Sequence, residues 1–187
     1  TKSPKKWASL KLAPLAVGLL LFIGPAQAVF HLMKVVQVFT GTPASPSAKY
    51  VLLQMYASGQ NLVDDHDVLV YNALGTQIGR VVFTSNVPSG ANQARILIAT
   101  TQAETFFGVQ ADLEMPASML ADGGKVCFAG TIDCVAWGSY RGSLTGVGTP
   151  FGAPSGIPGG RAAVRRLDIS GSTTTLNSGD DTNNSAN

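Results

Sequence analysis

The chain has 187 residues, enough for one small domain after an N-terminal leader. Only 13% of the residues are charged, about half the share that is usual in a soluble domain. The leader, residues 1–28, holds four of the 13 Lys and Arg residues and none of the 11 acidic residues, so the remainder has nine bases against 11 acids and a formal charge of −2. This balance excludes the basic surface on which nucleic-acid binding depends. The low charge is typical either of a Gly-rich β domain outside the cytoplasm or of a surface covered by a partner or lipid.

The leader supports two interpretations. Four lysines precede an apolar run, and Ala26-Gln27-Ala28 has the small-x-small form of a signal-peptide cleavage site. The uninterrupted run, Leu12–Gly24, is shorter than the roughly 20 residues of a membrane-spanning helix, but extended to Phe30 it just reaches that length. Because the chain retains the segment, we expect residues 1–30 to be an uncleaved anchor, with the lysines in the cytoplasm. The apolar residues expected in the membrane are Leu15, Leu19, Leu20, Leu21, Phe22 and Ile23.

After the leader the pattern is that of β-strands. Short runs rich in Val, Ile, Leu and aromatic residues alternate with turns rich in Gly, Pro, Asn and Ser. Together these runs predict a small antiparallel β-sandwich. The expected strands are Leu32–Phe39, Lys49–Tyr56, Asp67–Tyr71, Gln77–Phe83, Ala94–Thr100, Gly124–Phe128 and Ile132–Trp137.

The remaining elements are one short helix and a long C-terminal segment. Thr101-Gln-Ala-Glu104 has the form of a capping box, and Gly108 should end the helix that it begins. Residues 139–160 are dominated by Gly and Pro and predict an extended arm without regular structure. Ala162–Ser170 has the composition of one last strand, and the polar tail after it should add nothing to the core. The expected parts are therefore the anchor (1–30), the sandwich (31–138), and the arm with its tail (139–187).

The two cysteines, Cys127 and Cys134, both follow the leader and would be exported with the domain. An even number of cysteines in an oxidising compartment predicts a disulfide. Two cysteines without a neighbouring histidine do not make a four-ligand zinc site.

Four segments are informative when they are taken in order: HLMKVVQVF (31–39), AKYVLLQMYASGQNLV (48–63), VPSGANQARILI (87–98) and GGKVCFAGTIDCVAWG (123–138). Together they resemble the lamin-tail domain of exported bacterial proteins. The resemblance covers residues 31–138 and implies an immunoglobulin-like sandwich that serves as a binding or structural module, with no catalytic residues to carry over. The low charge and the leader depart from the family's common pattern.

Few residues are candidates for chemistry. Asp64-Asp65-His66-Asp67 is dense in carboxylates but lacks the alternating oxygen ligands and distal Glu of a calcium loop, so a solvated turn is favoured. His31, just after the apolar segment, could ligate a haem or a pigment, although a hydrogen-bonded interfacial histidine is the simpler interpretation. No nucleophile elbow or phosphate-binding glycine motif is present. We therefore expect no enzyme activity, no cofactor, no metal and no small-molecule substrate.

The leading functional hypothesis is a non-catalytic accessory subunit of a bacterial membrane complex. The anchor would cross the inner membrane once with its N-terminus in the cytoplasm, and the periplasmic β domain would clamp integral-membrane subunits and touch lipid. A photosynthetic reaction-centre and antenna assembly is one candidate host, and a respiratory complex is another. The alternative is a secreted adhesion or ligand-binding module with a cleaved leader. The expected partner-binding residues are Phe151, Ile157, Arg161, Arg165 and Arg166. The arm could instead pack on its own sandwich, and a solvated strand end is the simpler interpretation of the three arginines.

Overall fold

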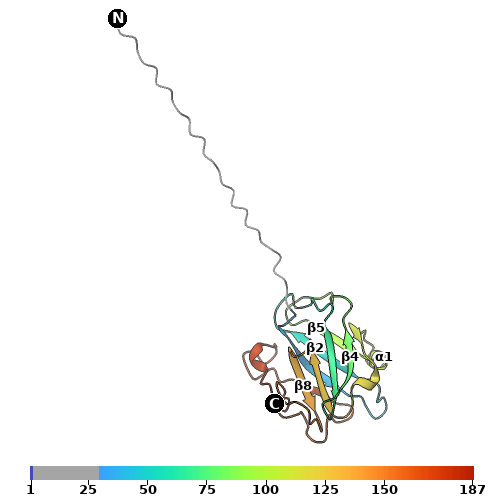
Figure 1. Cartoon of the computed structure of the whole chain (residues 1–187). Helices are drawn as coiled ribbons and strands as arrows, with labels where there is room; N and C mark the ends of the chain where they lie inside the picture. Colours follow the sequence, from blue (N-terminus) through green and yellow to red (C-terminus); the bar gives the residue numbers. More distant parts are fainter. Residues whose placement is uncertain (2–29) are drawn as a thin grey trace.

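The computed structural model describes Thr1 and residues 30–187, which form two β-sheets packed face to face (Figure 1). The expected anchor, including Leu15 and the other apolar residues up to Ile23, lies outside the described residues. Within the part of the chain that is described, no helix has the length and apolarity needed to cross a bilayer.

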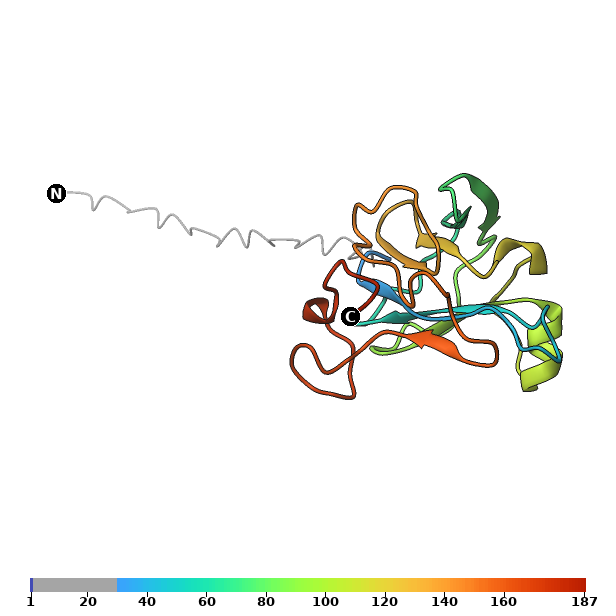
Figure 2. The same ribbon diagram turned by 90° about the horizontal axis from the view of Figure 1, so that it is seen from below.

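The first sheet has five strands in the order β6-β5-β2-β1-β9. Its neighbours are antiparallel except for β5 and β6, which are parallel. In Figure 2 this layer, with β2 in cyan and β9 in orange-red, lies below β4 in green. The strands are β1 (Met33–Phe39), β2 (Tyr50–Met55), β5 (Arg95–Ala99), β6 (Leu113–Glu114) and β9 (Ala162–Val164).

The second sheet has four antiparallel strands in the order β4-β3-β7-β8. All seven strands predicted from the sequence are confirmed, with ends that differ by one residue at most. The short strand β6 was not predicted, and the expected last strand, Ala162–Ser170, is regular only in β9. The strands of this sheet are β3 (Asp67–Asn72), β4 (Gln77–Val82), β7 (Gly124–Phe128) and β8 (Asp133–Trp137).

The core lies between the two sheets, where alternate residues of each strand point inward. In β2, Val51, Leu53 and Met55 are fully buried, while Leu52 lies on the outer face. Trp137 of β8 is also buried, and its indole N–H donates to the carbonyl of Ala121 at 2.9 Å. Burial of these apolar side chains is the main stabilising contribution, at about 25 cal/mol for each Å² removed from water.

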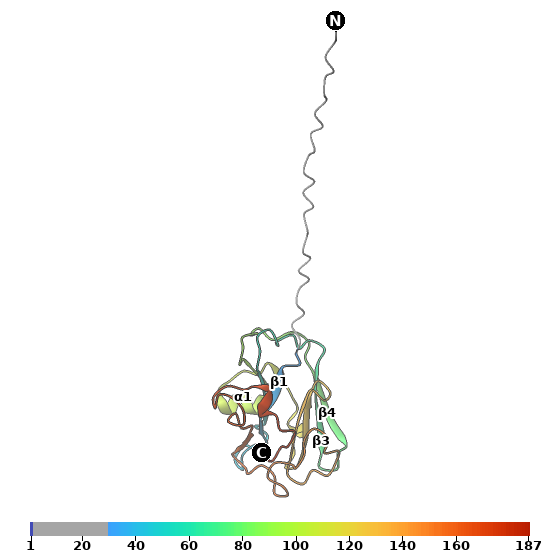
Figure 3. The same ribbon diagram turned by 90° about the vertical axis from the view of Figure 1, so that its left-hand side faces the viewer.

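The predicted helix is confirmed as α1 (Thr101–Phe107), but its cap lies one residue earlier than expected. Thr100 is extended, and its hydroxyl accepts the N–H of Ala103 at 3.1 Å, so Thr101 is already helical. Glu104 is therefore one position beyond N3 and does not complete a capping box, and its carboxylate accepts the N–H of Ala111. The helix buries only Ala103 and lies beside the first sheet, away from β3 and β4 (Figure 3).

Residues 139–161 contain no strand, in agreement with the predicted arm, but they lie against the chain's own sandwich. Gly156 (φ +86°) shows why glycine is needed there, since a Cβ at this position would lie 2.4 Å from the carbonyl oxygen of Asp122.

The expectation that the polar tail adds nothing to the core is wrong. Leu176 is only 2% exposed, and its backbone N–H donates to Oε1 of Gln93 at 2.8 Å. Asp180, in the short 3-10 helix η2 (Ser178–Asp180), is buried because its carboxylate accepts the N–H groups of Ser170 and Asn177. A second 3-10 helix, η1 (Ala117–Met119), precedes β7.

Candidate functional site

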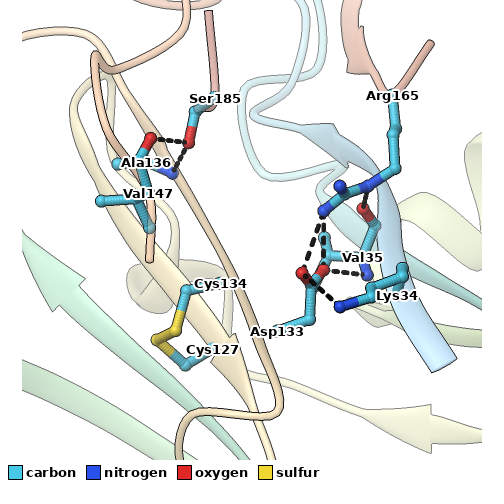
Figure 4. The surroundings of a disulfide bond; sticks show 9 residues. All are labelled: Lys34, Val35, Cys127, Asp133, Cys134, Ala136, Val147, Arg165 and Ser185. Atoms are coloured by element: carbon cyan, nitrogen blue, oxygen red, sulfur yellow. Dashed lines mark hydrogen bonds and ion pairs between the residues drawn. A yellow bond between two sulfur atoms is a disulfide. The ribbon is translucent and has the colours of Figure 1, made fainter. Parts of the chain in front are cut away.

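The predicted disulfide is confirmed. Cys127 of β7 and Cys134 of β8 lie directly opposite each other in the register of the two strands, and an S–S bond joins them (Figure 4). The bridge joins neighbouring strands of one sheet, so it holds the β7–β8 hairpin and does not link the two layers.

The two expected anchors of the arm both contact the chain's own sandwich. The backbone of Phe151 extends the sheet beside β8, since its N–H donates to Ala136 and its carbonyl accepts from Gly138, both at 2.9 Å. Ile157 is 7% exposed and belongs to the main core. Packing of the arm on its own sandwich was the alternative that the sequence left open. This packing leaves Ile157 little surface for a partner.

The three arginines do not form one patch. Arg161 is exposed, and Arg166 pairs with exposed Asp168 at 2.9 Å. Arg165, which follows β9 directly, points inward, so the solvated strand end expected from the sequence is wrong for this residue (Figure 4). The reason lies in Asp133, a buried carboxylate of the other sheet that the arginine reaches.

Asp133 is the centre of a buried ion cluster between the two sheets (Figure 4). Its side chain is 2% exposed and accepts two hydrogen bonds from Nη2 of Arg165, at 2.8 and 3.1 Å. It also accepts the backbone N–H of Val35 at 2.7 Å, and Nζ of Lys34 lies 3.6 Å away. Asp181 from the tail completes the cluster, at 2.5 Å from Lys34 Nζ and 3.1 Å from Arg165 Nη1.

The pKa shifts in the cluster reflect competition between burial and pairing. Burial raises the pKa of Asp133 to about 6, although Arg165 and Lys34 act in the opposite direction. Burial opposes ionisation of Asp181 and Lys34 as well, but their mutual hydrogen bond and the neighbouring charges prevail. The pKa of Asp181 is therefore lowered and that of Lys34 is raised.

Two side chains of the cluster bond to the backbone of β1 where its pairing with β9 has ended. The pairing of β1 with β2 shifts register between Val35 and Gln37, and β9 ends opposite Gln37. Beyond that point Nε of Arg165 donates to the carbonyl of Val35 at 3.0 Å, and Asp133 takes the N–H of the same residue. The adjoining cavity, about 40 Å³, has room for a few water molecules only. All four charges are paired, so we interpret the cluster as structural.

The outer face of the five-stranded sheet carries a more open feature, which we call the sheet groove. It has a volume of about 240 Å³, lies beside α1, and has no charged residue in its lining. Leu97, Leu52 and Gln37 face one another across β5, β2 and β1 and form one row of its floor. The lining residues are Gln37, Tyr50, Leu52, Leu97, Ala99, Ala103, Phe107 and Val109.

An aromatic cluster forms one wall of the sheet groove. The rings of Phe39 and Tyr50 stack with centroids 5.2 Å apart, and Phe107 meets both edge-on at 5.5 and 5.7 Å. Phe107 and Val109 are 44% and 47% exposed, so apolar surface remains in contact with water. The hydroxyl of Tyr50 donates to Oε1 of Gln37 at 2.9 Å, and burial raises the pKa of this tyrosine.

Sequence reasoning missed the sheet groove, although the signal is visible in the sequence. Leu52 and Leu97 are large apolar residues at positions that alternate with core residues, where a half-buried strand normally has polar side chains. Phe107 and Val109 lie at the end of a short helix and just after it, and this helix buries only one residue. Two large apolar side chains so close together are unusual at solvent-exposed positions.

The residues considered as metal ligands, Asp64–Asp67 and His31, do not come together in a metal site. Asp67 pairs with Arg80 at 2.7 Å, and the ring of His66 packs on Phe30 with centroids 3.4 Å apart. His31 is exposed and packs on the same phenylalanine at 4.2 Å. In the described part of the chain, His, Cys, Asp and Glu side chains form no group of three or more that could hold a metal ion.

Comparisons with protein-family models, curated proteins and solved structures found no match for this chain. The fold class is therefore defined by its two mainly antiparallel sheets.

Proposed function

We propose that this chain is a non-catalytic binding domain that acts outside the cytoplasm and docks a partner protein in the sheet groove. The observation that carries the proposal is the uncharged groove, with Phe107 and Val109 left exposed beside it. Concave, mainly apolar features with a few polar groups are the default binding sites of soluble domains.

The cellular setting of the proposal combines the disulfide with the leader. The Cys127–Cys134 bridge supports an oxidising compartment such as the bacterial periplasm. An anchor at residues 1–30 would then present the domain to integral-membrane subunits of an inner-membrane complex, of which a photosynthetic assembly is one candidate. The mass of the native N-terminus tests this setting, because a start at Val29 would contradict the anchor and favour a secreted module.

The strand order supports the immunoglobulin-like type of sandwich as part of the proposal. Leaving out the short β6 and β9, strands β1, β2 and β5 share one sheet, and β3, β4, β7 and β8 share the other. Immunoglobulin-like domains distribute their first, second, third, fifth, sixth and seventh strands in the same way. The fourth strand differs from the constant type, because β4 lies beside β3, where variable-type domains have their strand C′. The disulfide within one sheet departs from the inter-sheet bridge of antibody domains. The lamin-tail resemblance rests on the sequence motifs alone.

The docking proposal can be tested by co-purification of the tagged full chain from solubilised membranes. The variant Phe107→Lys/Val109→Lys places two charges at the sheet groove, and we expect it to fold normally but to lose the partner. A matched control is Ile78→Lys/Leu144→Lys, because these residues are 44% and 49% exposed and do not line the groove. Equal recovery of the partner by both variants would show that the groove is not the docking site.

A further inference from the structure

The chemistry of the sheet groove and its rim defines what it would bind. Resting on the proposed function above, we infer that its occupant is a peptide segment of the partner in which a large apolar side chain lies next to a lysine or arginine. The apolar side chain would enter the groove against Tyr50 and Phe107. The cation would lie at the rim beside Glu104 and Asp112.

The size of the sheet groove fits a side chain better than a larger ligand. Its volume of about 240 Å³ is below the roughly 300–1,000 Å³ of pockets that enclose drug-sized molecules. From Leu97 to Gln37 its floor crosses two strand spacings, which is roughly 10 Å. Even a square floor of that width has an area of only roughly 100 Å², far below the roughly 800 Å² that each partner buries in a stable dimer. One apolar anchor from an extended segment matches these dimensions.

Two carboxylates border the sheet groove at its α1 side. Asp112 accepts the N–H of Leu97, a groove residue, at 2.8 Å. Glu104 lies on α1 between the groove residues Ala103 and Phe107, and it accepts the N–H of Ala111 at 2.7 Å. None of the ion pairs found among the described residues involves either carboxylate. Their negative charge is therefore free to attract a cation.

The charge of Arg95, the cation nearest to Leu97 on β5, gives the occupant a direction. Arg95 lies two residues before Leu97 on the outer face of β5, farther from α1, and its Nε donates to Gln54 at 3.1 Å. A second cation would be repelled at that end, so the basic side chain of the occupant should lie toward α1. The same signs disfavour a membrane surface, because anionic headgroups are attracted by basic residues and not by Glu104 and Asp112.

The experiment is a selection of random heptapeptides displayed on phage against the immobilised, detergent-solubilised full chain. We expect enrichment of sequences with an aromatic or large aliphatic residue next to Lys or Arg. A synthetic peptide of the enriched sequence would then be titrated by fluorescence anisotropy. The variant Glu104→Gln/Asp112→Asn keeps both hydrogen-bond acceptors and removes both charges. It should weaken binding about 2- to 10-fold and flatten the salt dependence.

Asp64→Asn is the matched control, since Asp64 also accepts a backbone N–H, from Asp65 at 3.1 Å, and is exposed away from the sheet groove. It should leave the affinity unchanged. Enrichment of acidic or purely apolar peptides, or of no sequence, would overturn the inference. So would binding that is insensitive to Glu104→Gln/Asp112→Asn, stable dimerisation in analytical ultracentrifugation, or capture by phosphatidylcholine vesicles through Phe107.

The two proposals can fail separately. If Phe107→Lys/Val109→Lys abolishes co-purification of the partner but the selected peptides lack a basic residue, the groove remains the docking site and only the chemistry of its occupant is wrong. If that variant keeps the partner, and the selected peptides bind it as they bind the unaltered chain, both proposals are refuted.

Discussion

Replacing Arg165 with methionine tests how the C-terminal segment is held to the sandwich. The substitution keeps an apolar stem but removes the guanidinium from the ion cluster. Asp133 would lose its contacts at 2.8 and 3.1 Å, Val35 the donor to its carbonyl at 3.0 Å, and Asp181 its contact at 3.1 Å. Asp133 would retain the N–H of Val35 and Lys34 at 3.6 Å.

The expected loss of stability depends on whether the carboxylate of Asp133, once it has lost Arg165, stays ionised or takes up a proton. Removing one partner of a buried ion pair costs roughly 3–5 kcal/mol. Protonation limits that cost. A pKa of about 6 against the usual 3.8 already opposes ionisation of Asp133 in the unaltered chain by about 3 kcal/mol at pH 7, and a fully neutral carboxyl would raise this to about 4 kcal/mol. Asp133 therefore contributes about 1 kcal/mol to the loss, and the hydrogen bonds of Arg165 to Val35 and Asp181 contribute about 1–3 kcal/mol more. We expect Arg165→Met to lower the free energy of unfolding by about 2–4 kcal/mol at pH 7. The loss should be smaller at pH 5, where Asp133 is protonated in both proteins.

The assay is urea unfolding followed by the fluorescence of buried Trp137. Arg166→Met is the control in the neighbouring residue, because its exposed pair with Asp168 should contribute about 0–1 kcal/mol. The double variant Asp133→Asn/Arg165→Met should recover part of the loss, since no charge is then left unpaired. If Arg165→Met unfolds at the same urea concentration as Arg166→Met, the cluster does not hold the C-terminal segment.

The folded chain binds a proton at Asp133 with a pKa of about 6, against 3.8 as the usual value, so between these pH values it holds more protons than the unfolded chain. Its free energy of unfolding should therefore fall as pH rises from about 4 to 6, and urea titrations of Asp133→Asn should lack that component. The Cys127–Cys134 bridge closes a short loop, so its reduction should lower the free energy of unfolding by only about 2 kcal/mol. Urea unfolding with and without a reductant measures this difference, and complete unfolding on reduction would contradict it. Leu176→Ala should cost about 2–5 kcal/mol and Leu144→Ala, at an exposed site, much less; equal thermal midpoints would show that the tail is not packed.

The elements that depend on neighbours in the chain could be predicted from the sequence. Strand positions follow from runs of β-forming residues between turn residues, because a strand's inward and outward faces alternate with a period of two. The end of α1 at Gly108 follows from the tolerance of glycine for the left-handed conformation observed there (φ 65°). The disulfide could be predicted because the chain has only two cysteines. Each of these inferences uses information within a few residues or a simple count.

The contacts between residues far apart in the sequence were decided by the tertiary structure. Lys34 and Asp181 are 147 positions apart, and they meet only because β1 lies beside β9 and the tail returns over that edge. Arg165 reads as a surface residue in the sequence, and it turns inward because the other sheet places a buried carboxylate within its reach. The sheet groove likewise combines β1, β2, β5 and α1, whose order across the sheet differs from their order in the chain. Local propensity does not encode such pairings, because they depend on which edges and faces come together when two sheets bury a common core.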